Sequence, residues 1–212
     1  MRTLWRSAGL WCWIAALAWP LGAQPDDLLM RIWNGVQKAQ TEHASGCGKI
    51  VETRTSKLLA KPMVFRGKFC ADGMDRFVLE YTEPDPIRIR FNRDYLNVTT
   101  GGGKHTEAIE VGSKVRQTQA YFSRENSIEN LKKNFAIQVH EDGGLYEMKL
   151  VPSSARFRRR LNYVVVKLAK ENFLLRSLEI DGTSGVNSVF AIDITSLDAK
   201  IPPSTFEVYR PR

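Results

Sequence analysis

Apolar and polar side chains alternate along two runs within the segment Phe77–Phe91. A turn with two prolines, Glu83–Pro86, separates the runs, and strict alternation on both sides of such a turn predicts a β-hairpin. If the runs pair with Glu80 opposite Arg88, one face gains an oppositely charged cross-strand pair. The same register makes the other face wholly apolar, with Phe77, Leu79, Tyr81, Ile87, Ile89 and Phe91. One register therefore satisfies both faces of the predicted hairpin.

The remaining pattern indicates two helices and a long series of strands. Apolar residues at helical spacing predict an amphipathic helix over Asp26–Ala44 and a second helix over Ser123–Asn134. Runs rich in β-branched and aromatic residues predict strands at Lys49–Thr55, Val64–Cys70, Tyr95–Thr99, Phe135–His140, Leu145–Pro152, Asn162–Lys170, Leu174–Ile180 and Val186–Thr195. Weaker candidates are Thr106–Val115 and Phe206–Tyr209. The economical assembly is an α+β fold, mainly antiparallel β, with one sheet of about ten strands.

A sheet of that length must curl, because long twisted sheets do not stay flat. We therefore expect an incomplete, half-open β-barrel, with helices covering an apolar cavity. The N-terminal helix would close the mouth of this cavity with Ile32 and Trp33. The candidate ligand-binding residues all lie on apolar faces of the predicted elements, and they are Ile32, Trp33, Phe69, Phe77, Leu79, Tyr81, Ile87, Ile89 and Phe91.

The first residues have the pattern of a secretory signal peptide. Arg2 and Arg6 give a positively charged start, Ala8–Pro20 is apolar, and small residues end the stretch at Ala23. This pattern predicts a signal peptide over residues 1–23, cleaved after Ala23, and the apolar run is too short to favour a transmembrane helix. Residues 24–212 would then form a single domain of an exported protein.

Two of the three cysteines, Cys47 and Cys70, remain after the predicted cleavage. An even pair in a chain bound for an oxidising compartment favours a disulfide, and two buried thiols are the alternative. Both cysteines lie in predicted strands on either side of a turn at Lys57–Lys61. Direct pairing would also set Lys49 opposite Lys68, which like charges disfavour, so we expect a bulge or a diagonal contact.

The chain is basic, with 31 Lys and Arg, 23 Asp and Glu, and a formal net charge of +8. A basic exported protein could meet anionic lipid, an acidic polymer or an acidic partner. The most basic run contains Arg156, Arg158, Arg159 and Arg160. It is either a solvated strand edge or a contact for anionic headgroups or an acidic membrane partner. Export and the absence of a recognised module in the sequence argue against a nucleic-acid partner.

The sequence contains no recognisable catalytic or cofactor-binding motif. The histidines His43, His105 and His140 have no second ligand at metal spacing, so the sequence predicts no metal site. No Cys–His or paired-carboxylate arrangement appears in the sequence either. Triads assemble from distant residues, so an enzyme is not excluded, but it is not the interpretation we favour.

Several segments, in this order along the chain, resemble the LolA-like family, the periplasmic carriers of outer-membrane lipoproteins. The matching segments are the signal peptide, the helix from Asp26, Phe65–Phe69, Phe77–Pro84, Phe135–Ile137 with Tyr146–Pro152, Leu178–Asp181, and Ile201-Pro202 with Phe206. The resemblance implies an unclosed antiparallel barrel covered by helices, whose apolar cavity shelters acyl chains. It also implies a monomer without catalysis or cofactor, which takes acylated lipoproteins from an inner-membrane complex to an outer-membrane acceptor.

The chain departs from the family at one position. The carriers have an arginine before a proline, between the second and third strands, that latches the helical lid. Here the aligned residue is Gly73, and Arg76 lies three residues further on. This departure leaves two alternatives beside the lipoprotein carrier: a LolA-like carrier of a lipid or glycolipid, and an envelope-stress sensor domain that binds a signal and a partner protein.

Overall fold

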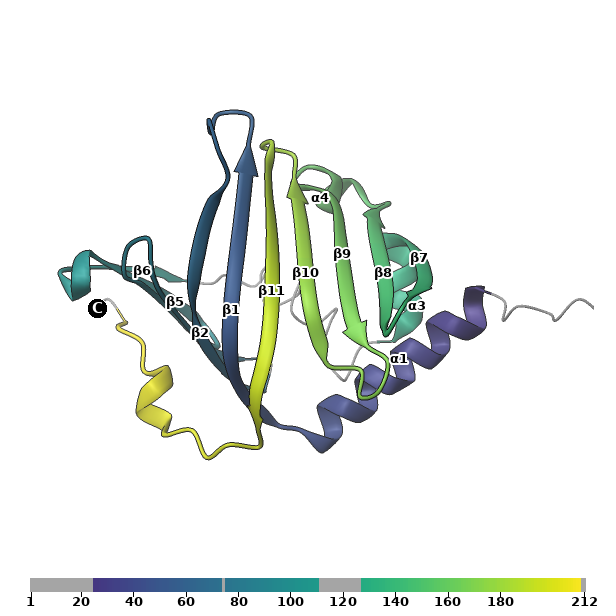
Figure 1. The fold of residues 1–212 in the computed structure, drawn as a ribbon, viewed down its shortest axis with the longest axis horizontal. Coiled ribbons are helices and arrows are strands. Elements are labelled where there is room, and N and C mark those ends of the chain that lie inside the picture. Colours follow the sequence, from purple (N-terminus) through teal and green to yellow (C-terminus); the bar gives the residue numbers. More distant parts are fainter. Residues whose placement is uncertain (1–24, 74, 111–126, 211–212) are drawn as a thin grey trace, which may run out of the picture.

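The computed structural model describes residues 25–73, 75–110 and 127–210 (Figure 1). The predicted signal peptide over residues 1–23 lies outside this part of the chain, as do residues 123–126 of the second predicted helix and residues 111–115 of the weak candidate strand. The helices are α1 (Pro25–Glu42), α3 (Ile128–Asn134) and α4 (Ala155–Arg158), with the 3₁₀ helices η1 (Gly101–Gly103) and η2 (Pro203–Phe206). The strands are β1 (Ser45–Ser56), β2 (Met63–Asp72), β3 (Arg76–Glu83), β4 (Ile87–Asn92), β5 (Tyr95–Thr100), β6 (His105–Glu110), β7 (Phe135–Asp142), β8 (Leu145–Pro152), β9 (Leu161–Ala169), β10 (Leu175–Gly182) and β11 (Val186–Leu197).

All the described strands belong to one antiparallel sheet of eleven strands. Their order is β6-β5-β4-β3-β2-β1-β11-β10-β9-β8-β7, so the first and last strands of the chain pair at the centre. Strands β6 and β7 form the two ends of the sheet and do not pair with each other, so the curled sheet stays open (Figure 1). The predicted α+β fold with an incomplete barrel is therefore confirmed.

The hairpin β3–β4 has the register that the alternation predicts. Tyr81 lies opposite Ile87, and Glu80 lies opposite Arg88. The Arg88 Nε atom is 2.6 Å from the Glu80 Oε1 atom, which completes the expected cross-strand ion pair. The pairing follows from local sequence, because the turn between the strands is short and both faces agree on one register.

Directly opposed residues in an antiparallel sheet place their side chains on the same face. We call the face against which α1 packs the inner face, and the opposite one the outer face. One row of the inner face crosses seven neighbouring strands, from β7 to β2, through Val139, Met148, Val166, Leu178, Phe190, Glu52 and Phe65. The glutamate interrupts an otherwise apolar row, a feature that matters for the candidate site.

Helix α1 covers the inner face at the β7–β9 end of the sheet (Figure 1). Its Leu29 joins a buried cluster with Leu131 of α3 and Leu150 of β8. Asp26 and Asp27 lie in the first turn, where carboxylates interact favourably with the positive end of the helix dipole. Helix α3 begins at a capping serine, Ser127, whose side chain accepts a hydrogen bond from the Asn130 backbone.

The C-terminal segment packs against the other end of the sheet. The prediction of a strand over Phe206–Tyr209 is wrong: η2 ends at the buried Phe206, and an irregular stretch follows. Instead of a strand, the buried Asn97 side chain provides both hydrogen bonds for the Tyr209 backbone: its amide donates to the Tyr209 carbonyl at 3.0 Å, and its oxygen accepts from the Tyr209 N–H. One side chain thereby satisfies the Tyr209 backbone groups that pairing with a neighbouring strand would otherwise satisfy.

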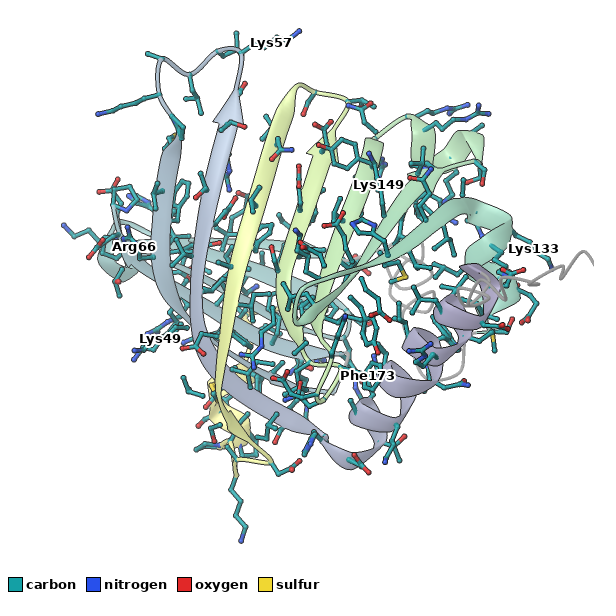
Figure 2. The ribbon with its side chains drawn as sticks, turned by 45° about the vertical axis from the view of Figure 1, so that its right-hand side comes forward. Lys49, Lys57, Arg66, Lys133, Lys149 and Phe173 are labelled. Carbon is teal, nitrogen blue, oxygen red and sulfur yellow. A yellow bond between two sulfur atoms is a disulfide. The ribbon has the colours of Figure 1, made fainter. Side chains whose placement is uncertain are left out.

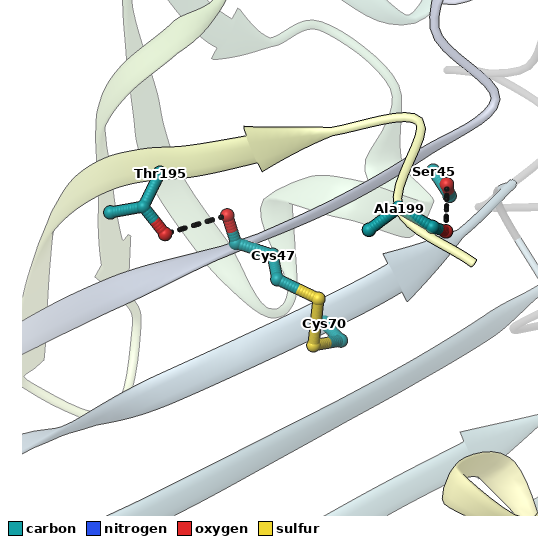
Figure 3. Close-up of a disulfide and its surroundings, with 5 residues drawn as sticks. All are labelled: Ser45, Cys47, Cys70, Thr195 and Ala199. Carbon is teal, nitrogen blue, oxygen red and sulfur yellow. Dashed lines mark hydrogen bonds between the residues drawn. A yellow bond between two sulfur atoms is a disulfide. The ribbon is translucent and has the colours of Figure 1, made fainter. Parts of the chain in front are cut away.

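The disulfide between Cys47 and Cys70 is present, as predicted (Figure 3). It joins β1 to β2 close to the point where the C-terminal segment leaves the sheet. Nearby, the Ser45 hydroxyl donates to the Ala199 carbonyl at 3.0 Å (Figure 3). The bridge therefore ties the paired strands together beside the junction with α1.

The two cysteines are direct cross-strand partners. The expectation of a bulge or a diagonal contact between these strands is therefore wrong. Lys49 does lie opposite Lys68 in the same register. Both lysines are exposed, and each has an acidic residue as its partner on the other neighbouring strand, Asp193 and Glu80 respectively. Solvent and these carboxylates weaken the repulsion that the pair alone would suffer.

Candidate functional site

A pocket of about 400 Å³ lies on the inner face, between the β3–β4 hairpin and the start of β9. Its volume is within the range of about 300–1,000 Å³ that is usual for small-ligand sites. Residues from six strands, with Arg160 before β9 and Ser184 before β11, line it: Glu52, Arg54, Leu79, Tyr81, Ile89, Arg160, Leu161, Ile180, Gly182, Ser184, Val186, Ser188 and Phe190. Most of this wall is apolar, but three charged side chains contribute to it.

Glu52 is the buried charge of the pocket, with a side chain that is only 2% exposed. Its Oε1 atom accepts hydrogen bonds from Arg54, through Nη2 at 2.7 Å and Nε at 3.0 Å, and from the Ser188 hydroxyl at 3.0 Å. Its Oε2 atom accepts from the Tyr81 hydroxyl at 2.6 Å. A buried carboxylate is tolerated because these donors replace the water that it has lost.

The tyrosine in this cluster is held in its neutral, donating form. Burial, together with the hydrogen bond to Glu52 and the charge of that carboxylate, raises the pKa of Tyr81 far above its ordinary value. Its ring also lies against Phe65, with the ring centroids 5.4 Å apart. Tyr81 therefore contributes an apolar ring to the wall of the pocket and a fixed hydroxyl donor to the carboxylate.

Arg54 is the most accessible member of the cluster, with 41% of its side chain exposed. The carboxylate of Glu52 holds one edge of the guanidinium group, and the group lies 4.8 Å from the centre of the Phe65 ring. Its remaining N–H groups have no hydrogen-bond partner in the described part of the chain. The guanidinium group is thus fixed in place and still has N–H donors that could bind a ligand.

Three of the nine candidate cavity residues line this pocket: Leu79, Tyr81 and Ile89. Phe69 and Ile87 pack beside them in the same apolar cluster. Phe77 and Phe91 form a ring pair further along the hairpin, with centroids 5.4 Å apart. The hairpin residues therefore gather on one surface, as their alternation predicts.

Ile32 and Trp33 lie elsewhere on the inner face. Ile32 is buried with Tyr146 and Leu168, and Trp33 packs against the cluster that contains Leu150. The apolar stripe of α1 therefore covers β7–β9, and the structure does not bring these two residues together with those that line the pocket. The location of the helix depends on contacts with strands that are distant in sequence, which the helical pattern cannot predict.

A close contact anchors α1 to the sheet. A Cβ atom built on Gly35 would lie 2.4 Å from atoms of the Phe173 ring, so the absence of a side chain at Gly35 lets the ring touch the helix backbone. Figure 2 shows Phe173 beside α1. The ring also stacks on Tyr146, with centroids 5.5 Å apart. Phe173 has a φ of +57°, a conformation that costs a phenylalanine energy and that these ring contacts hold in place.

The described residues near the position of the carriers' latching arginine contact residues outside α1 here. Arg76, which follows the aligned Gly73 by three residues, pairs with the Asp72 carboxylate and lies over the Phe206 ring at 5.7 Å. Asp72 is the last residue of β2 and Phe206 belongs to the C-terminal segment, so neither partner is in α1. The Gly73 backbone N–H donates to the Ala44 carbonyl at 2.8 Å, just after the helix ends. Among the described contacts, the middle of the helix is held by Gly35 against Phe173 and by Ile32 against Tyr146 and Leu168.

One residue of the basic run reaches the pocket. Arg156 and Arg158 belong to α4, Arg159 follows it, and Arg160 lines the pocket. All four side chains are exposed. Arg158, Arg159 and Arg160 have no carboxylate within ion-pair distance in the part of the chain that the structure describes.

The polar centre of the site is not predicted by the sequence pattern. In β1 the inner-face positions include Ile50, Glu52 and Arg54. Glu52 thus occupies a position where both neighbouring strands have a phenylalanine, and Arg54 follows it on the same face. The signal was a break in apolar alternation. It becomes informative only when the register with β11 shows which face these residues occupy.

Comparisons with known proteins find likeness in fold. No family model and no curated protein matches the sequence. Among solved structures, the chain is similar to an uncharacterised conserved protein from Thermus thermophilus, with a TM-score of 0.52, 8% identity, and coverage of 86% of this chain and 94% of that one. It is also similar to a LolA superfamily protein from Nitrosomonas europaea, with a TM-score of 0.43, 13% identity, and coverage of 84% and 97%.

A third similar structure is the lipoprotein LppX from Mycobacterium tuberculosis, with a TM-score of 0.47, 12% identity, and coverage of 84% of this chain and 98% of that one. One of these similar structures thus belongs to the LolA superfamily that the sequence resembles. At these identities the likeness concerns the fold alone.

Two further observations concern metal ligands and membrane-spanning helices. The described residues contain no group of three histidine, cysteine or acidic side chains that could hold a metal ion. None of the described helices is long and apolar enough to cross a membrane.

Proposed function

We propose that this protein is an exported, monomeric carrier that shelters the acyl chains of a lipid-modified client against the inner face of its open sheet. The observation that carries the proposal is the pocket of about 400 Å³ whose apolar wall is formed by the predicted hairpin and by β10 and β11. Each methylene group that leaves water for such a wall contributes roughly 0.8 kcal/mol, so a long acyl chain supplies ample driving force.

The sequence resemblance to LolA-like carriers supports the same proposal and extends it to a cellular route. The client would be an acylated lipoprotein, or a lipid or glycolipid, received from an inner-membrane complex and delivered to an outer-membrane acceptor in the periplasm. The predicted signal peptide over residues 1–23 supports export. Binding and release need no bond to be made or broken, so this function requires neither catalysis nor a cofactor.

A charge placed on the wall of the pocket tests the proposal. Ile89 is partly buried and lines the pocket, so an aspartate there remains partly hydrated and the sheet still folds. We expect Ile89→Asp to weaken binding of a fluorescent apolar probe by about tenfold or more, because an acyl chain would have to desolvate the carboxylate. Val64→Asp is the matched control: Val64 is 38% exposed and lies on the outer face, so probe binding should not change.

Two outcomes would contradict the proposal. In the first, the unmodified protein binds neither the apolar probe nor an acylated peptide added as competitor. In the second, Ile89→Asp unfolds the domain as a charge in a dry core would, at a cost of several kcal/mol. Leu150→Asp provides the comparison for that second outcome, since Leu150 is completely buried and its variant should unfold.

A further inference from the structure

The charges of the pocket are unbalanced. One carboxylate, Glu52, and two guanidinium groups, Arg54 and Arg160, contribute to its lining, which leaves one net positive charge. The carboxylate is saturated by hydrogen bonds from Arg54, Tyr81 and Ser188, so it offers nothing to a ligand. Its role is to hold the Arg54 guanidinium at the edge of an apolar surface.

Both arginines have donors left for a ligand. Arg54 uses Nε and Nη2 on Glu52, and its other N–H groups have no hydrogen-bond partner among the described residues. Arg160 also lines the pocket, is exposed, and has no ion-pair partner in the described part of the chain. Planar guanidinium groups bind carboxylates and phosphates through paired hydrogen bonds.

We propose that the pocket selects an amphiphile with an anionic headgroup, a carboxylate or a phosphate. Arg54 and Arg160 bind the oxyanion, while the tail lies against Leu79, Ile89 and Phe190. This inference rests on the proposed function, because it names the chemical class of the acyl-bearing client. It also gives Glu52 a purpose, since a buried carboxylate fixes the arginine in advance and lowers the entropy lost when the headgroup binds.

Competition among three amphiphiles of equal tail length tests the headgroup. The purified protein is loaded with a fluorescent long-chain fatty acid, and hexadecanoate, hexadecyl phosphate and hexadecanol are added below their micelle concentrations. We expect both anions to displace the probe at concentrations about tenfold lower than the neutral alcohol, the ratio expected for one charge-assisted hydrogen bond. The ratio of the two anions shows whether the site prefers a fatty acid or a phosphate-bearing lipid.

Variants assign the effect to the two arginines. Arg160→Gln removes an exposed side chain, so it should fold normally and weaken both anions about tenfold without changing the affinity for hexadecanol. The double variant Glu52→Gln with Arg54→Gln removes the second guanidinium without leaving a buried carboxylate unpaired. Arg66→Gln is the matched control, because Arg66 is exposed on the outer face and pairs with Glu83 (Figure 2).

The outcomes separate the two proposals. Equal competition by hexadecanoate and hexadecanol, or equal losses in Arg160→Gln and Arg66→Gln, overturns the headgroup inference and leaves the acyl carrier intact. Failure of all three amphiphiles to displace the probe, or failure of the probe to bind at all, overturns the carrier proposal itself and the inference with it.

Discussion

Gly35 provides the sharpest test of how α1 is held on the sheet. It lies inside the helix Pro25–Glu42, where replacing glycine by alanine ordinarily stabilises a protein. Here a Cβ atom would lie 2.4 Å from Phe173 Cδ1 and Cε1 and 2.5 Å from Cγ, far inside van der Waals contact. The ring cannot easily move away, because it is also stacked on Tyr146. We therefore expect Gly35→Ala to destabilise the fold.

Whether Gly35→Ala stabilises or destabilises the protein depends on the sizes of two opposing free-energy changes. The gain in helix propensity is about 0.5–1 kcal/mol. Forcing an extra carbon into a packed contact costs about 1–3 kcal/mol. The net change should be a loss of up to about 2.5 kcal/mol, and it should reverse to a gain of about 0.5–1 kcal/mol once the ring is removed by Phe173→Ala.

A double-mutant cycle measures this reversal. Urea unfolding is followed by tryptophan fluorescence for the unmodified protein, Gly35→Ala, Phe173→Ala and the double variant, and the midpoints are compared at constant slope. A coupling free energy of about 1–3 kcal/mol between the two positions supports the anchor. If Gly35→Ala stabilises the protein equally in both backgrounds, the ring does not rest on the helix, and the account of how α1 is held is wrong.

Two further predictions follow from the disulfide and from the buried tyrosine. Cys47 and Cys70 close a loop with a sequence separation of 23, so Cys47→Ser with Cys70→Ser should lower the free energy of unfolding by about 3 kcal/mol, and the unreduced, unfolded protein should contain no free thiol among these two. The raised pKa of Tyr81 means that, above the ordinary tyrosine pKa of about 10, the unfolded chain loses a proton that the folded chain keeps, so stability falls as pH rises through that range. Tyr81→Phe should reduce this alkaline loss of stability in urea titrations at pH 8 to 11, whereas Tyr209→Phe, at an exposed tyrosine, should not.

Local sequence was sufficient for the elements that depend on near neighbours. The β3–β4 hairpin was predictable with its register, because alternation, the proline turn and the Glu80–Arg88 pair constrain strands that are only a few residues apart. The disulfide was predictable for a similar reason, since Cys47 and Cys70 flank one turn. The helix at α1 was predictable as a helix, because its apolar stripe repeats at 3.6 residues.

The tertiary structure decided what these elements do together. In the sequence, Glu52 and Arg54 look like ordinary charged residues of a strand. The pairing of β1 with β11 brings Ser188 and Phe190 beside them, although more than half of the chain separates the two strands. The same long-range pairing places Arg160 at the pocket, and the packing of α1 on β7–β9 separates Ile32 and Trp33 from it. Contacts between residues far apart in the chain depend on the whole folded state rather than on a repeating local pattern. The sequence therefore determined the strands and the apolar hairpin face, whereas only the long-range pairing of the strands determined where a buried charge meets that face.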